Sequence, residues 1–479
     1  MGLRTVPTDR VDLDVPCAAT RDASGNPFLI WAEAKDADVP VPHDRAAAER
    51  WLREHAAALG HTGFTAVFAR AGTFRGYDEW KFELERDGLR LFDADVSLYF
   101  DADGRCLGLS NRVPRLGSVV AKPAEGAGTE VWYARRDDRG EVVRARLVTS
   151  TTETHRVTEL FDTGRSVHRI LEQLHWPAQA EQATITEYTS PGMVFPDQIW
   201  ADSKGLIWFS EPPAARISVF DPNTGNFSSH PTTGWSSPDG LVVDDQDRVW
   251  FGLYSTDHGL GTIDIPSGRF TRYPAPYPGA NLAIPTPSGR GTIYVTDHFS
   301  ERISEFDPET GTWVRSITLP SPSYPVGAHL EAETQDAWFP LYFFHGLGRL
   351  TPAGQFTRLQ APSSGGPAFG AANDGRVYFT YWLVNRIGVY DIAAGTFTEY
   401  VMRAGEVGGP MAMSPTGEAV IGTRNVGYIA VFDPVTRTFT DYRIPTGGSG
   451  LKDGLTVAPD GTVWFTESGS NKIAKLVLP

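Results

Sequence analysis

The chain has 479 residues, 21% of them charged, and contains 49 glycines and 35 prolines. This length favours two domains with separate cores, and the glycine and proline content favours turn-rich β structure. A formal net charge of −15 argues against a nucleic-acid partner, because phosphates require a basic surface. No stretch approaches the roughly 20 apolar residues of a membrane helix, and the first residues lack a secretory signal. We therefore expect a cytoplasmic protein without a membrane partner.

Residues 1–150 predict an α+β domain. The segment HDRAAAERWLREHAAALG, residues 43–60, has apolar residues at helical spacing and ends at a glycine. Strand-like runs such as EWKFELER and LRLFDADVSLYF follow it. We expect one helix against an antiparallel sheet, and then a helical linker over residues 151–182, which contain TETHRVTELFDTGRSVHRILEQ.

The stretch from residue 43 to residue 117 resembles the propeptide (PepSY-like) domains of secreted metalloproteases. The similarity lies in AAAERWLREHAAALG and in LFDADVSLYFDADGRCLGLSNRVPRLG. No HExxH zinc motif follows, and the chain has only two cysteines, Cys17 and Cys106, too few for a cysteine-ligated zinc site. The resemblance therefore implies a packing or dimerising module, and the oligomeric state is left open.

Residues 183–479 contain a unit that recurs seven times at steps of 40 to 44 residues. Each unit holds four short strand-like runs separated by turn residues, which is typical of one propeller blade. The second strands are expected at Ile207–Glu211, Val249–Leu253, Ile293–Asp297, Ala337–Leu341, Val377–Tyr381, Ala419–Thr423 and Val463–Glu467. The repeat therefore predicts an all-β, seven-bladed β-propeller after the α+β domain.

The two ends of the repeat region complement each other. ATITEY, residues 183–188, reads as an outer strand without a blade, whereas the last repeat stops at KIAKLVLP before its outer strand. Pairing these segments would close the ring and remove exposed strand edges. Asp221, Asp307 and Asp433 each begin an Asp-Pro-x-Thr turn, and we interpret these turns as structural.

Propellers bind ligands where loops converge at the mouth of the central channel. Asp197, Asp239 and Asp453 precede the inner-strand turns of consecutive blades in a closed ring, with Asn281 equivalent to them. Such oxygen ligands suit Mg²⁺ or Ca²⁺, and Glu211 and Glu467 flank the same sector. Two alternatives stay open: the aspartates only cap turns, and the glutamates form hydrogen bonds between blades.

Other side chains at the same mouth suit substrate binding and proton transfer. His298 follows Asp297 at a strand end, where a neighbouring carboxylate would tune it as a general base. Arg424 would receive a carboxylate or carbonyl oxygen. Aromatic residues form a candidate wall for an apolar substrate, with packing between blades as the alternative. This wall comprises Tyr254, Tyr342, Phe343, Phe344, Tyr381 and Trp382.

The repeat region resembles the streptogramin B lyases in WFTE, SNKIAKL, TITEY and the PDGL opening. This resemblance implies a seven-bladed propeller and a magnesium-assisted elimination that opens the ester of a cyclic depsipeptide. It places the base, a last-blade histidine, on Asp453 and a second histidine on Met411. The metal carboxylate falls on Ser468 or Glu467, and a first-blade tyrosine falls on Asp197.

These observations together predict a lyase- or cyclase-type enzyme acting on a bulky natural product. Asp453 or His298 would move a proton, with Asp239 near the same site, while a divalent cation or the acidic cluster polarises the substrate. A lactone hydrolase is an alternative on the same residues, because a metal-bound water would attack in place of elimination. A non-catalytic ligand-binding propeller is the alternative from another class.

Overall fold

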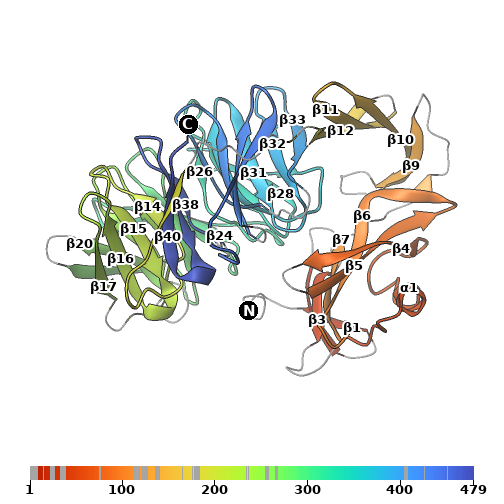
Figure 1. The fold of residues 1–479 in the computed structure, drawn as a ribbon, viewed down its shortest axis with the longest axis horizontal. Helices are drawn as coiled ribbons and strands as arrows, with labels where there is room; N and C mark the ends of the chain where they lie inside the picture. The colour runs from red at the N-terminus through yellow and green to blue at the C-terminus, as the bar shows by residue number, and fades with distance from the viewer. Residues whose placement is uncertain are drawn as a thin grey trace.

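The computed structural model of the chain describes most of the sequence. The described residues are 9–13, 16–21, 27–32, 39–74, 77–112, 116, 119–120, 128–134, 141–163, 165–174, 176, 184–232, 235, 237–253, 258–264, 268–403, 408–424, 427–449, 451 and 453–478. Nearly all regular structure in them is β-strand (Figure 1). None of the helices in these ranges is long and apolar enough to span a bilayer.

The described residues of the N-terminal part form twelve strands and the α-helix α1, Arg45–Glu54. The strands are β1 Asp9–Asp12, β2 Pro16–Arg21, β3 Pro27–Ala32, β4 Thr65–Phe74, β5 Tyr77–Arg86, β6 Leu89–Phe100, β7 Cys106–Arg112, β8 Val119–Val120, β9 Thr129–Ala134, β10 Val142–Thr151, β11 His155–Asp162 and β12 Arg165–Gln173. The Asp44 side chain caps α1 by accepting a hydrogen bond from the Ala47 backbone N at 2.8 Å. Trp51 and Leu52 of α1 pack into the same apolar core as Phe82 of β5. The helix is shorter than the expected span of residues 43–60, since turns follow Glu54.

The expected helical linker over residues 151–182 was wrong where the structure describes it, because β11 and β12 form an antiparallel hairpin there. β11 pairs with β10 and β12 pairs in parallel with β33, Thr396–Val401. Strand neighbours on both sides satisfy the backbone hydrogen bonds of the hairpin, and this tertiary pairing stabilises strands where a helix was expected. The boundary at residue 150 stays a prediction, and a single sheet continues across it.

Six separate four-stranded sheets make up most of the propeller in the described residues. In order they contain β14 Ile199–Ala201, β15 Ile207–Glu211, β16 Arg216–Asp221 and β17 Asn226–Pro231; β18 Pro238–Val243, β19 Val249–Leu253, β20 Gly259–Asp264 and β21 Arg269–Pro274; β22 Leu282–Pro287, β23 Ile293–Asp297, β24 Arg302–Asp307 and β25 Thr312–Thr318; β26 His329–Leu330, β27 Ala337–Leu341, β28 Gly346–Leu350 and β29 Phe356–Gln360; β34 Gly408–Met413, β35 Ala419–Thr423, β36 Tyr428–Asp433 and β37 Thr438–Arg443; and β38 Leu455–Val457, β39 Val463–Glu467 and β40 Lys472–Leu476 with β13 Ile185–Tyr188. Short 3-10 turns, Pro212–Ala214 and Ser468–Ser470, follow β15 and β39.

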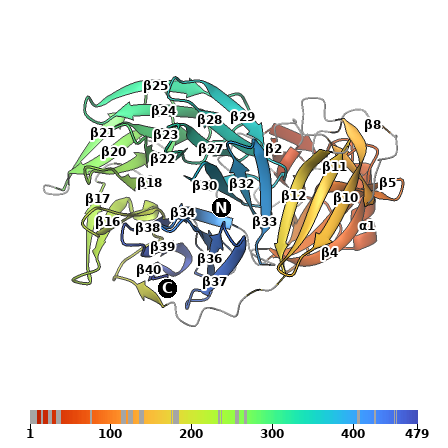
Figure 2. The same ribbon diagram turned by 90° about the horizontal axis from the view of Figure 1, so that it is seen from above.

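The expected count of seven blades is not confirmed, because the described residues form six separate four-stranded sheets. The strands expected for the remaining blade are β30 Pro367–Asn373, β31 Arg376–Tyr381, β32 Arg386–Asp391 and β33. They end a 16-stranded sheet instead, since β12 occupies the outer edge of β33 and joins it to the N-terminal strands. Figure 2 shows β30–β33 within the ring of sheets and β12 beside β33.

The predicted closure of the ring is confirmed. β13 pairs antiparallel with β40, with Ile185 opposite Leu476 and Tyr188 opposite Ile473. Lys472 Nζ donates to Glu187 Oε2 at 2.6 Å across this junction. The closing strand thus adds both a ladder of backbone hydrogen bonds and an ion pair.

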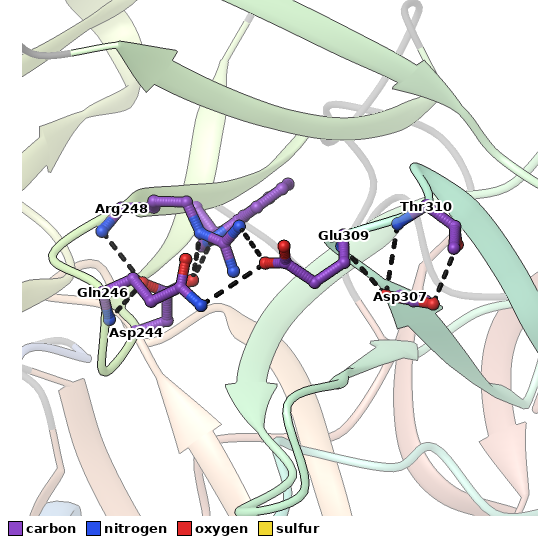
Figure 3. A network of polar contacts seen from close by, with 7 residues as sticks. Asp244, Gln246, Arg248, Asp307, Glu309 and Thr310 are labelled. Atoms are coloured by element: carbon purple, nitrogen blue, oxygen red, sulfur yellow. Dashed lines mark hydrogen bonds and ion pairs between the residues drawn. The ribbon is translucent and has the colours of Figure 1, made fainter.

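The expected structural role of the Asp-Pro turns is also confirmed. Asp307 Oδ1 accepts from the Glu309 backbone N at 2.9 Å, and its Oδ2 accepts from Thr310 Oγ1 at 2.8 Å. The same turn carries Glu309 toward the preceding sheet, where Arg248 Nη1 donates to its Oε1 at 2.8 Å (Figure 3). Arg248 also contacts Asp244 Oδ2 at 2.7 Å, so the turn links two adjacent sheets.

Candidate functional site

A continuous series of aromatic side chains links the loops at the ends of several second strands. We call His298, Tyr324, Tyr342, Phe343 and Trp382 the aromatic arc. The ring of His298, after β23, lies 4.8 Å from that of Tyr324, which precedes β26. Tyr324 lies 4.9 Å from Phe343 after β27, and Tyr342 lies 4.9 Å from Trp382 after β31. These distances are typical of favourable aromatic contacts.

The arc has a buried layer and a more accessible one. Tyr342 and Phe343 are only 4% and 7% exposed, so little of the Phe343 surface is accessible, and its contact with a substrate stays a prediction. The half-buried Tyr324 and Trp382 pack on them, together with Ile284 of β22 and Phe369 of β30. Buried rings thus support a second layer, Tyr324 and Trp382, that is only partly buried.

Arg424, which follows β35, ends the arc with a positive charge. Its guanidinium lies 4.7 Å from the centre of the Trp382 ring, within the range of a cation–π interaction. Arg424 Nη1 donates to Asp453 Oδ1 at 3.0 Å. Both side chains keep some exposure, 12% for Arg424 and 18% for Asp453. The structure therefore brings together three predicted site residues from three different loops.

His298 belongs to the arc, but its expected partner has another role. Asp297 is fully buried, and its Oδ2 accepts from Tyr277 Oη at 3.0 Å and from the Asn281 backbone N at 2.7 Å. Its Oδ1 accepts from the Ser300 backbone N at 2.9 Å. Asp297 therefore fixes two loops of its own sheet.

Glu211 does not form part of an open metal site. Its side chain is 1% exposed and receives both Nε and Nη2 of Arg216, at 2.8 and 2.7 Å. The Val194 backbone N and Ser218 Oγ donate to it as well, at 2.7 and 2.6 Å. These contacts agree with the alternative stated for Glu211 above, in which its carboxylate forms hydrogen bonds within the propeller.

Glu467 occupies the same strand position in the last sheet and lies beside another carboxyl group. Burial, together with the negative charge of Glu187, raises the pKa of Glu467 to about 7. Although burial opposes ionisation of Glu187, the hydrogen bonds from Lys472 and Thr446 hold its pKa below the ordinary value. Below about pH 7 the pair therefore carries a single negative charge, on Glu187, at the junction where the ring closes.

The expected oxygen ligands are not gathered into one set. Asp197 is 1% exposed, and its backbone carbonyl accepts from Thr466 Oγ1 at 2.7 Å, a contact between the first and last sheets. Asp239 is a half-buried residue of β18. Across the described part of the chain, no group of three or more His, Cys, Asp or Glu side chains is arranged to hold a metal ion. The residues therefore do not fit the expected Mg²⁺ or Ca²⁺ site.

Two further expected substrate contacts were Tyr254 and Tyr381. Tyr254 is outside the described residues. Tyr381 is fully buried, and its Oη donates to Glu399 Oε1 at 2.7 Å; these contacts match the alternative of packing within the propeller, and the role in the substrate wall stays a prediction. Sequence reasoning missed Glu399 of β33, because nothing in its own repeat marks a buried acid. It also missed Tyr324, although an aromatic residue in a loop entering an inner strand was a usable signal.

Comparison with known proteins decides the family. The model of the virginiamycin B lyase family matches residues 178–432 and 283–478. The chain belongs to the virginiamycin B lyase family. This membership supports a lyase-like propeller in general, and it covers the sheets that carry the aromatic arc, Arg424 and Asp453.

Solved structures of this family share the fold of the chain. A streptogramin B lyase is 24% identical, with a TM-score of 0.57, and the match covers 62% of this chain and 98% of that one. Virginiamycin B lyase from Staphylococcus aureus is 22% identical with the same TM-score, over 62% of this chain and 100% of its own. A catalytically inactive variant of that enzyme, solved with quinupristin, matches equally well. At these identities the similarity shows the fold alone. No curated protein matches the chain.

Proposed function

We propose that the chain is a lyase-type enzyme that binds a bulky, partly aromatic natural product on the aromatic arc. The observation that carries this proposal is the Arg424–Asp453 pair, held at 3.0 Å at the end of the arc. The accessible rings of Tyr324 and Trp382 would cover apolar parts of the substrate, and the guanidinium would bind a carbonyl oxygen.

Elimination at an ester needs a proton acceptor and a group that stabilises the departing oxygen. In our proposal Asp453 accepts the proton from the carbon next to the C–O bond. The C–H electrons form a C=C bond, and the C–O bond breaks to leave a carboxylate paired with Arg424. The ion pair places the proposed proton acceptor, Asp453, beside the guanidinium that would bind the departing oxygen.

His298 lies at the other end of the aromatic arc, beyond Tyr324, Tyr342 and Trp382. We therefore assign it to a distal part of the bound molecule and not to the reacting bond. A divalent cation is left out of the proposed steps, because the described carboxylates do not converge on one point.

Quinupristin is a suitable first probe, since a related propeller has been solved with it. The chain would be incubated with quinupristin and other aromatic macrolactones, and the products followed by mass spectrometry. A ring-opened product of unchanged mass is expected, since elimination adds no atoms. A product heavier by one water would favour the lactone hydrolase, and bound but intact compound the binding propeller. If no compound is bound, the proposal is wrong.

Arg424→Gln should strongly lower turnover, and it has a matched control in the same chain. Arg248 also pairs with an aspartate, Asp244 at 2.7 Å, and lies 5.6 Å from the Trp250 ring, away from the arc. Arg248→Gln therefore removes a similar set of contacts. Loss of turnover in the Arg424 variant alone would assign the effect to the site.

A further inference from the structure

Glu399 is a buried acid at the junction between the propeller and the N-terminal strands. It lies on β33 and is 0% exposed. His168 Nε2 from β12 donates to its Oε2 at 2.8 Å, and Tyr381 Oη donates to its Oε1 at 2.7 Å. Ser363 Oγ and Arg386 Nη1 also donate to Oε2, at 2.8 and 3.1 Å. A single carboxyl group thus joins residues from four segments.

These donors keep Glu399 in its charged form. Burial opposes ionisation, but the charge and hydrogen bond of His168, together with Arg386 and Tyr381, hold the pKa of Glu399 well below its ordinary value. A charged acceptor forms stronger and more directional hydrogen bonds than a neutral one. The positions of Tyr381 and Ser363 are therefore tied closely to Glu399.

Both of these residues lead directly to Trp382 of the aromatic arc. Tyr381 is its neighbour in the chain, and Ser363 begins the segment 363–366, whose carbonyls accept from the next loop. The Trp382 backbone N donates to Gly366 O at 3.1 Å, and the Leu383 backbone N donates to Gly365 O at 3.0 Å. Glu399 therefore holds the two chain segments between which Trp382 is placed.

The packing at this point leaves little room for Trp382 to move. Gly366 has a φ of +67°, and a Cβ there would lie 2.4 Å from Cε2 of Tyr342. The loop backbone is thus in direct contact with the buried layer of the arc. A shift of this loop would therefore displace the Trp382 ring, over which the Arg424 guanidinium lies.

The contact from outside the propeller comes from the hairpin of β11 and β12. β12 pairs in parallel with β33, with Ile170 opposite Glu399, and this pairing brings His168 to the carboxylate. On its other side the His168 ring makes an edge contact of 5.3 Å with Phe92 of β6. The residues matched by the family model begin at 178, after this hairpin.

We infer that Glu399 is a positioning residue, through which His168 of the β11–β12 hairpin sets the orientation of Trp382. The inference rests on the proposed function only where it makes Trp382 part of the substrate wall. It assigns the N-terminal strands a role at the site, in addition to covering the edge of β33.

The orientation of Trp382 can be measured without any ligand. The full chain would be labelled with 5-fluorotryptophan, and the ¹⁹F resonance of Trp382, one of 13 tryptophans, assigned by its loss in Trp382→Phe. His168→Ala and Tyr381→Phe should each shift or broaden that resonance. His155→Ala is the matched control, since His155 is also a buried histidine of the hairpin, and its Nε2 contacts Arg437 O at 2.7 Å.

An unchanged Trp382 resonance in folded His168→Ala, or an equal change in His155→Ala, would overturn the inference. Should His168→Ala fail to fold, Tyr381→Phe decides, because it removes one hydroxyl and keeps the ring. The Trp382 resonance is measured without turnover, so it tests the positioning role independently of the proposed function. A shifted resonance in a chain that binds no macrolactone would support the positioning role and contradict the proposed function.

Discussion

Arg424 Nη1 lies 3.0 Å from Asp453 Oδ1, and the same guanidinium lies 4.7 Å from the centre of the Trp382 ring. The three side chains come from loops after β35, before β38 and after β31. A positive charge held in this way has a defined direction, because the carboxylate and the ring face restrict the rotamers of the long side chain.

Arg424→Gln should lower kcat/KM for an accepted substrate by about 10²–10³-fold, a loss typical for removal of one group that stabilises developing negative charge. Steady-state kinetics of the variant, beside Arg248→Gln, check this prediction. Equal losses in the two variants would contradict it.

Glu467 should make stability fall as the pH rises. Its pKa is raised from 4.5 to about 7, so the folded chain binds this proton more tightly than the unfolded chain. The contribution is fully present below about pH 4.5 and is lost as the pH rises through about 7, on the order of 3 kcal/mol. Glu467→Gln stays neutral and should lack this loss, as measured by denaturant unfolding at pH 5 and pH 8.

Glu211→Gln is the control for that experiment, since Glu211 has the same place in its strand but pairs with Arg216. Loss of this charged partner should cost roughly 1–3 kcal/mol at both pH values. A wild-type chain with the same pH dependence as Glu467→Gln would contradict the assignment.

Chelation should leave the described fold unchanged. Dialysis against EDTA is expected to leave Tm where it was, because ligands that bind the folded state raise Tm and the described residues contain no such ligand set. Elemental analysis alongside the melting curves provides the check. The prediction would be contradicted if the chain held one Mg²⁺ or Ca²⁺ that EDTA removed with a fall in Tm. If Glu467→Gln lacked this ion, the expected metal site at Glu467 would be supported.

Gly454→Ala should destabilise the ring at its closing junction. A Cβ at Gly454 would lie 2.0 Å from the backbone O of Asp197 and 2.4 Å from Thr466 Oγ1. Backbone atoms cannot move far to relieve such a clash, so we expect the free energy of unfolding to fall by roughly 1–3 kcal/mol or more. Gly447→Ala, in open space before the same sheet, should change it little, and denaturant titration compares the two.

Much of the propeller could be predicted from local pattern. Strands such as Ile207–Glu211 and Val463–Glu467 were expected at the bounds that β15 and β39 have, because alternating apolar residues between turn residues specify a strand directly. The hairpin of β11 and β12 could not be predicted in this way. Its strand pairing depends on β33, which is distant in the chain. The local spacing of apolar residues in β11 and β12 does not indicate which strand they pair with.

The sequence by itself determined the repeat, the strand order within each separate four-stranded sheet and the closing pair of β13 and β40. These follow from short-range alternation and turn chemistry. Only the tertiary structure decided which polar residues meet: Arg424 with Asp453, Glu399 with His168, Glu211 with Arg216. Such pairs depend on how separate loops and strands are placed in space. A side chain's type therefore indicates what it can bind, while the fold determines what it does bind.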